Sequence, residues 1–156
     1  MTDTPAIPAI DMDGFMARYA AYESRANALL PANKTALFAA LQAAGITSVT
    51  VTFDGCGDSG QIDAIVARVG NEEITLPDIQ VEIARTDFHL DETRRESMAL
   101  PDAVETFCYD ALESRHGGWE NNEGGFGDFT FDVAARTIAF DFNYRIEKSE
   151  NHYHEL

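Results

Sequence analysis

SVTVTFD, residues 48–54, is the stretch that decides the fold class. Its apolar residues alternate with polar ones, which is the period of a strand that has one face in the core and the other in water. The turn-rich segment GCGDSG, residues 55–60, follows directly, and residues 62–69 return as a second strand. The sequence therefore predicts a half-buried strand pair joined by a glycine-containing turn.

The residues before this strand pair have the apolar spacing of helices. The apolar residues of the first helix recur three or four apart: Phe15, Tyr19, Tyr22, Ala26 and Leu29. We expect Pro31 to end that helix, since proline lacks the backbone donor that a helix interior needs. Asn33 is then placed to cap a second helix, which Gly45 terminates.

Downstream of the pair, Ile79, Val81 and Ile83 alternate as a third strand, whereas residues 85–99 are weakly patterned and indicate a loop or a short helical piece. Pro101 suits the first turn of a further helix, with Asp102 at capping-box spacing from Glu105. The apolar face of this helix is Val104, Phe107, Cys108, Ala111 and Leu112. Residues 129–133 and 138–146 predict a final hairpin.

These elements do not alternate as parallel strand–helix–strand units. The expected fold is therefore α+β, an antiparallel sheet of about five strands with two N-terminal helices and one helix before a C-terminal hairpin, all helices packed on one face. We expect a flexible leader over residues 1–10, a single domain over 11–148 and a polar tail over 149–156.

Charge narrows the range of partners. The chain of 156 residues has Lys+Arg 11 against Asp+Glu 27, a formal net charge of -16. This charge repels phosphate backbones and anionic lipid, so we expect no direct nucleic-acid binding, no membrane binding and, if any partner, a basic protein or a cation. The N-terminus lacks a secretory signal pattern, which predicts a cytoplasmic protein. The two cysteines, Cys56 and Cys108, exclude a four-cysteine zinc site.

The first glycine-containing loop carries a GDSG string around Ser59, as trypsin-like proteases do. The chain is too short for two barrels and offers no histidine in the required context, so Ser59 is not expected to be a nucleophile. Asp54, Asp58, Gln61 and Asp63 could instead supply oxygens to a divalent cation, although the spacing of an EF-hand is absent. A plain turn stabilised by aspartate side chains is the alternative.

The second loop, GGWENNEGGFG at residues 117–127, holds the single tryptophan. Its glycines permit a tightly folded shape that would present Trp119, Glu120, Asn121 and Asn122. The alternative is a connector whose Trp119 is tucked onto the core. This second loop also lacks the lysine of a phosphate-binding loop, and no strand comes directly before it.

The tail places His152 and His154 two residues apart, a spacing that allows both to chelate one metal if the tail is extended. A third ligand would have to come from His89, His116 or a carboxylate. A frayed terminus is the alternative, and we expect no obligatory cofactor.

Two motifs of the chain resemble those of a known protein family. The strand and loop FDGCGDSGQI, residues 53–62, together with GWENNEGGFG, residues 118–127, and the acidic hairpin after them resemble a bacterial domain-of-unknown-function family that is often carried on plasmids and prophages. The resemblance covers roughly residues 30 to 150. It implies a small intracellular protein and supplies no activity or catalytic residue.

Two functions fit these observations. The first is a non-enzymatic acidic protein that binds a basic partner, such as the nucleic-acid-binding surface of a host or defence protein, with Trp119 as anchor. The second is a cation-dependent enzyme or small-ligand protein with its site between the loops. We also predict that the two loops lie side by side at one end of the sheet, which a site shared by both loops requires. The candidate binding residues are Asp54, Asp58, Ser59, Gln61, Trp119, Glu120, Asn121, Asn122 and Glu123.

Overall fold

A computed structural model describes residues 11–56, 59–88, 92–121 and 123–156. The elements run α1 (Met12–Ala43), β1 (Ser48–Cys56), β2 (Ser59–Val69), β3 (Glu72–Ile74), β4 (Gln80–Thr86), β5 (Thr93–Ala99), α2 (Leu100–Arg115), β6 (Gly125–Asp132) and β7 (Thr137–Tyr144). An antiparallel five-stranded sheet has the order β3-β2-β1-β6-β7, and β4 and β5 form a second sheet. The α+β class is therefore confirmed.

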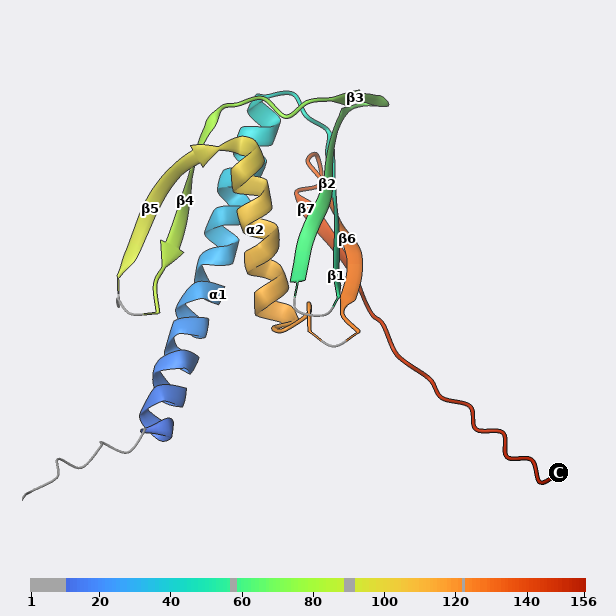
Figure 1. Ribbon diagram of the computed structural model, residues 1–156. Coiled ribbons are helices and arrows are strands. Elements are labelled where there is room, and N and C mark those ends of the chain that lie inside the picture. Colours follow the sequence, from blue (N-terminus) through green and yellow to red (C-terminus); the bar gives the residue numbers. More distant parts are fainter. Residues whose placement is uncertain (1–10, 57–58, 89–91, 122) are drawn as a thin grey trace, which may run out of the picture.

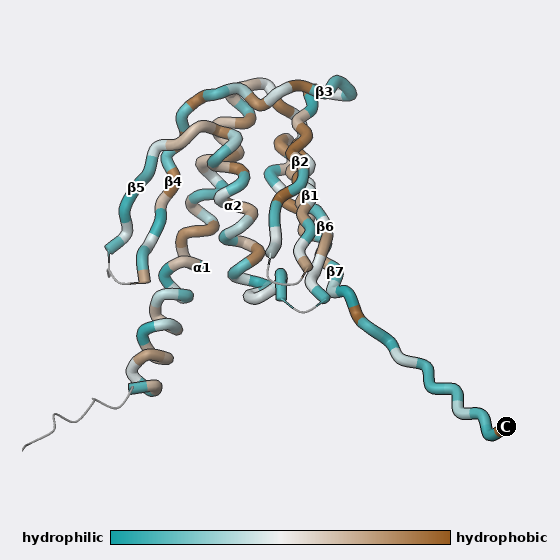
Figure 2. Tube along the Cα trace, viewed as in Figure 1, coloured by the Kyte–Doolittle hydropathy of each residue, from teal (hydrophilic) through white to brown (hydrophobic). Residues whose placement is uncertain are grey.

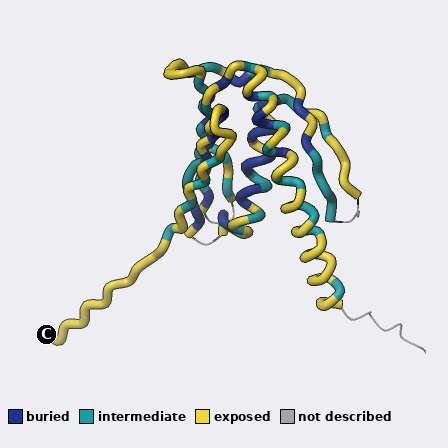
Figure 3. Tube along the Cα trace, turned by 180° about the vertical axis from the view of Figure 1, so that it is seen from behind, coloured by how far each residue is buried: buried dark blue, intermediate teal, exposed yellow. Residues whose placement is uncertain are grey.

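The two helices lie between the two sheets (Figure 1). The inner face of the large sheet contributes Val49, Val51 and Phe53 from β1 and Phe129 and Phe131 from β6, all of them buried. Helical side chains such as Leu41 and Leu112 pack against them. Buried positions accordingly concentrate where the helices and strands lie next to one another, whereas the C-terminal tail and the first turns of α1 are mostly exposed (Figure 3), and hydropathy along the chain is shown in Figure 2.

Helix α1 contradicts the prediction that Pro31 ends a first helix. It is one helix of 32 residues with Pro31 inside it. Proline costs a helix interior about 3 kcal/mol, but the turns after it bury Leu37, Phe38 and Leu41 completely or nearly so. Tertiary packing of that face outweighs the local signal.

Asn33 is correspondingly not a helix cap. It is 3% exposed, and its side-chain amide donates to the carbonyl oxygen of Ala84 at 2.9 Å while its Oδ1 accepts from the Ala84 N–H at 2.8 Å. The amide thus pairs with the backbone of β4 as a neighbouring strand would. This contact fixes β4 against α1 instead of beside β2.

The segment 85–99, expected to be a loop or short helical piece, instead completes β4 and supplies β5. The third strand therefore belongs to a separate sheet on the far side of the helices from the large sheet. Helix α2 also begins earlier than expected: Ala99 is its N-cap, Pro101 lies in its first turn as predicted, and Asp102 lies within the helix and is not the cap. Neither helix in the described part of the chain has the length and apolarity needed to cross a bilayer.

Candidate functional site

The two glycine-containing loops meet at one end of the large sheet. Strand β6 pairs with β1 so that Gly125 lies opposite Gly55, which places the loop after α2 beside the β1–β2 turn. A Cβ atom added to Gly55 would lie 2.6 Å from the indole of Trp119, and one added to Gly60 would lie 2.5 Å from it. The predicted convergence of the loops is therefore confirmed.

Trp119 fills this junction. Its side chain is 4% exposed, and its ring contacts that of Phe53 edge-on, with centroids 5.5 Å apart. Both glycines are required because any side chain at those positions would occupy the space of the indole. Trp119 is thus a core residue, as the alternative interpretation of the loop held, and it is not exposed to a partner in this conformation.

Asp54 is held by a residue that sequence reasoning missed. Arg145, just after β7, lies with one terminal nitrogen 2.9 Å from the Asp54 carboxylate and donates from the other to the Gly55 carbonyl oxygen at 3.0 Å. Its guanidinium also lies 4.8 Å from the centroid of the Phe126 ring. This ion pair ties the end of β7 to the β1–β2 turn across β6.

The remaining loop candidates are distributed around the junction. Ser59, Gln61 and Glu123 are exposed, and Gln61 donates to Asp63 at 3.2 Å. Asn121 forms the turn: its N–H donates to the Gly118 carbonyl oxygen and its own carbonyl oxygen accepts from Gly124. Asp58 and Asn122 lie outside the described residues.

Glu120 differs from the other loop residues because one of its oxygens is enclosed. The Oε2 atom is buried and, within the described residues, has no hydrogen-bond partner.

Among the described residues, no group of three or more His, Cys, Asp or Glu side chains is placed to hold a metal ion. His152 lies 3.1 Å from Glu150, and His154 is exposed on a tail that leads away from the body (Figure 1).

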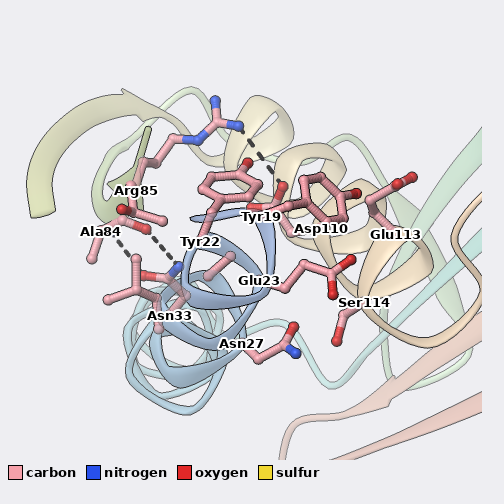
Figure 4. Close-up of a pocket in the computed structure, with 13 residues that line it drawn as sticks. Tyr19, Tyr22, Glu23, Asn27, Asn33, Ala84, Arg85, Asp110, Glu113 and Ser114 are labelled. Atoms are coloured by element: carbon pink, nitrogen blue, oxygen red, sulfur yellow. Dashed lines mark hydrogen bonds and ion pairs between the residues drawn. The ribbon is translucent and has the colours of Figure 1, made fainter. Parts of the chain in front are cut away.

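A separate cleft lies between α1, β4 and α2 (Figure 4). It has a volume of about 80 Å³ and is lined by Tyr19, Tyr22, Glu23, Ala26, Asn27, Leu29, Asn33, Ala84, Arg85, Thr86, Asp110, Glu113 and Ser114. Arg85 approaches Asp110 at 3.8 Å along one wall. The cleft is not predictable from the sequence, because it depends on β4 packing against the middle of an uninterrupted α1.

The negative charges of the carboxylates in the cleft are only partly balanced by nearby positive charge. Burial raises the pKa of Asp110, and the nearby Arg85 only partly opposes that shift. The pKa of Glu113 is raised by partial burial and then by the negative charges of Glu120 and Glu23. Both groups therefore favour the protonated form more in the folded protein than in the unfolded chain.

Glu113→Gln should raise the melting temperature at neutral pH. When folding raises the pKa of a carboxyl, the carboxyl stabilises the folded state fully at a pH below its pKa in the unfolded chain. This stabilisation is lost as the pH rises through its pKa in the folded protein. The gain from the substitution should therefore shrink toward about pH 4, close to the ordinary glutamate pKa. Thermal unfolding followed by circular dichroism at both pH values tests this, with Glu105→Gln on the exposed face of α2 as control. An equal gain for both variants, or at both pH values, would contradict it.

The outer face of the large sheet carries a second group of carboxylates. The residues that point away from the helices include Asp54 on β1, Asp128 and Asp132 on β6, and Asp141 on β7; we call this surface the aspartate face. Asp128 lies directly opposite Asp141 in the β6–β7 register. The cations nearby are already paired, Arg68 with Glu73 at 3.3 Å and Arg145 with Asp54.

Comparison with known proteins identifies the family of the chain without indicating an activity. The sequence model of DUF6878, described as a family of unknown function, matches residues 29–156, from within α1 to the last residue. No curated protein and no solved structure matches.

Proposed function

Because the chain belongs to DUF6878, a family of unknown function, we propose its function from the structure: it is a non-enzymatic acidic protein that binds a basic partner through the aspartate face. The helices and the second sheet cover only the inner face of the large sheet (Figure 1). No helix or strand of the described residues covers the aspartate face, which is therefore open to a partner.

The juxtaposition of Asp128 and Asp141 carries this proposal. Like charges directly opposite each other on neighbouring strands destabilise a sheet. Within the described residues neither carboxylate has an ion-pair partner, and both lie on the open face. A lysine or arginine supplied by a partner would remove this repulsion on binding, so the complex gains a stabilising contact that the free protein lacks.

The chemistry also suggests the kind of partner surface. Several carboxylates on one face of a sheet present negative charge to a protein, as a phosphate backbone does. We propose that the partner surface is one that otherwise contacts nucleic acid, as in a host or defence protein. The net charge of -16 would raise the rate of encounter with such a surface at low ionic strength.

A cation-dependent enzyme or small-ligand protein is the alternative, and the observation that favours it is the enclosed Oε2 of Glu120, which has no hydrogen-bond partner among the described residues. Against it, Trp119 fills the junction where that site was expected.

The double variant Asp128→Asn/Asp141→Asn should bind a fluorescein-labelled decalysine peptide about 5-fold more weakly than the wild type, the equivalent of about 1 kcal/mol. Fluorescence anisotropy at increasing salt measures this, and wild-type binding should weaken steeply between about 50 and 300 mM salt as exposed charges are screened. The matched control is Asp78→Asn/Glu105→Gln, which neutralises two exposed carboxylates outside the aspartate face.

The affinity of the control variant for decalysine should fall by less than about 2-fold, because the control changes net charge without changing the aspartate face. Equal loss in the two double variants would show that net charge alone drives the interaction. Binding that does not respond to salt would overturn the proposal.

A further inference from the structure

Strand β7 forms a free edge of the large sheet. Within the described residues it pairs only with β6. Its eight residues, TIAFDFNY, contain neither lysine nor proline, the residues that usually protect an edge strand. The opposite edge, β3, is only three residues long and carries Glu72 and Glu73.

The backbone of β7 is arranged to accept another strand. The N–H of Arg145 donates to the Gly124 carbonyl oxygen on the β6 side. Since backbone groups alternate in direction along an antiparallel ladder, residues 138, 140, 142 and 144 direct their N–H and C=O groups away from β6. These groups form a row along the edge.

The side chains at this edge are apolar and incompletely covered. Phe140 and Phe142 are partly buried, Tyr144 is 57% exposed, and Ile146, where the extended tail begins, is 86% exposed. An exposed, extended, apolar edge of this length favours pairing with another chain.

We propose that the occupant of this edge is a second copy of the chain, with the two β7 strands antiparallel and the two large sheets joined into one. A two-fold axis at Asn143 sets Asp141 of each copy opposite Arg145 of the other, so that this arginine, which pairs with Asp54 within its own chain, would bridge the two carboxylates. The same register sets Phe142 opposite Tyr144 and Phe140 opposite Ile146. Opposite charges and apolar side chains are thus paired across the axis.

Neighbouring registers are less favourable. A two-fold axis at Tyr144 would set Asp141 opposite Glu147, and an axis at Arg145 would set two arginines against each other. An axis at Phe142 would set Asp141 opposite Asn143, which leaves the carboxylate without a cation. Charge complementarity therefore selects the register centred on Asn143.

Salt should act on this contact in the opposite direction from its effect on a basic partner. Each copy has a net charge of -16, so long-range repulsion opposes pairing and screening should strengthen it. The proposal goes beyond the binding of a basic partner, because it concerns a different surface, although joining the copies would also extend the aspartate face across both.

Light scattering after size-exclusion chromatography should show a mass above the 17.2 kDa of one chain, approaching twice that value as salt or protein concentration rises. Ile146→Pro should return the protein to a single chain, because it removes both an edge-facing donor and an apolar contact. Ile146 is 86% exposed within one chain, so the variant should still fold. The control Tyr153→Pro, farther along the exposed tail, should leave the mass unchanged.

Disulfide trapping tests the register. In a Cys56→Ser background, Asn143→Cys should form an intermolecular disulfide, because paired residues in a non-hydrogen-bonded position lie about 4.5 Å apart at Cα, within disulfide range. Ala139→Cys, on the same face of β7, should not. A single-chain mass under all conditions, or trapping at 139 but not at 143, would overturn the proposal. At low protein concentration and low salt, where the single chain predominates, Ile146→Pro and the wild type should bind decalysine equally, so failure of either proposal can be recognised separately.

Discussion

Trp119→Ala should lower the free energy of unfolding by about 3–5 kcal/mol, the range for truncating a buried large aromatic side chain. The indole occupies the space between Gly55 and Gly60 and packs edge-on against Phe53. Its removal leaves a cavity that the glycines, having no side chains, cannot fill. Since small domains are typically stable by only about 5–15 kcal/mol, the loss would be a large part of the total. Urea denaturation followed by far-UV circular dichroism measures it.

Two controls separate packing from general sensitivity to aromatic loss. Trp119→Phe keeps a ring against Phe53 and should cost less than half as much. Tyr153→Ala removes an aromatic side chain that is 82% exposed and should have almost no effect. A wild-type unfolding curve for Trp119→Ala, combined with weaker decalysine binding, would instead support the sequence-based interpretation of Trp119 as a contact residue.

The strands of the large sheet were largely predictable because their alternation follows directly from one-sided burial. Val49, Val51 and Phe53 point inward while the residues between them face water, and the hairpin of β6 and β7 repeats the pattern. Strand β5 could not be found in this way. Its sequence TRRESMA is largely polar, and its Arg95 pairs with Glu82 of β4 at the surface. Only its pairing with β4 defines it as a strand.

The helix end expected at Pro31 is absent because a distant contact outweighs the local sequence preference. Asn33 and Pro31 together are typical of a helix boundary, but the partner of Asn33 is Ala84, 51 residues away. The convergence of the two loops was predictable from the position of the final hairpin. The Arg145–Asp54 ion pair was not, because it spans 91 residues and depends on the register of three strands.

Gly124→Ala should destabilise the protein by about 2–4 kcal/mol because the junction has no room for a methyl group. Gly124 adopts φ 81°, and a Cβ atom there would overlap the carbonyl oxygen of Gly55, a backbone atom that cannot move without opening the end of β1. The left-handed conformation accounts for about 1 kcal/mol of this cost, and overpacking typically adds about 1–3 kcal/mol. Urea denaturation provides the measurement.

Gly45 offers a matched control for the backbone conformation. Its φ of 76° is nearly the same, but a Cβ atom there would have nothing within 4 Å. Gly45→Ala should therefore cost only the conformational part, about 1 kcal/mol. The difference between the two variants isolates the steric contact of the second loop with the β1–β2 turn. If both alanines cost the same, the two loops are not in contact, and the packing of Trp119 between them would have to be abandoned as well.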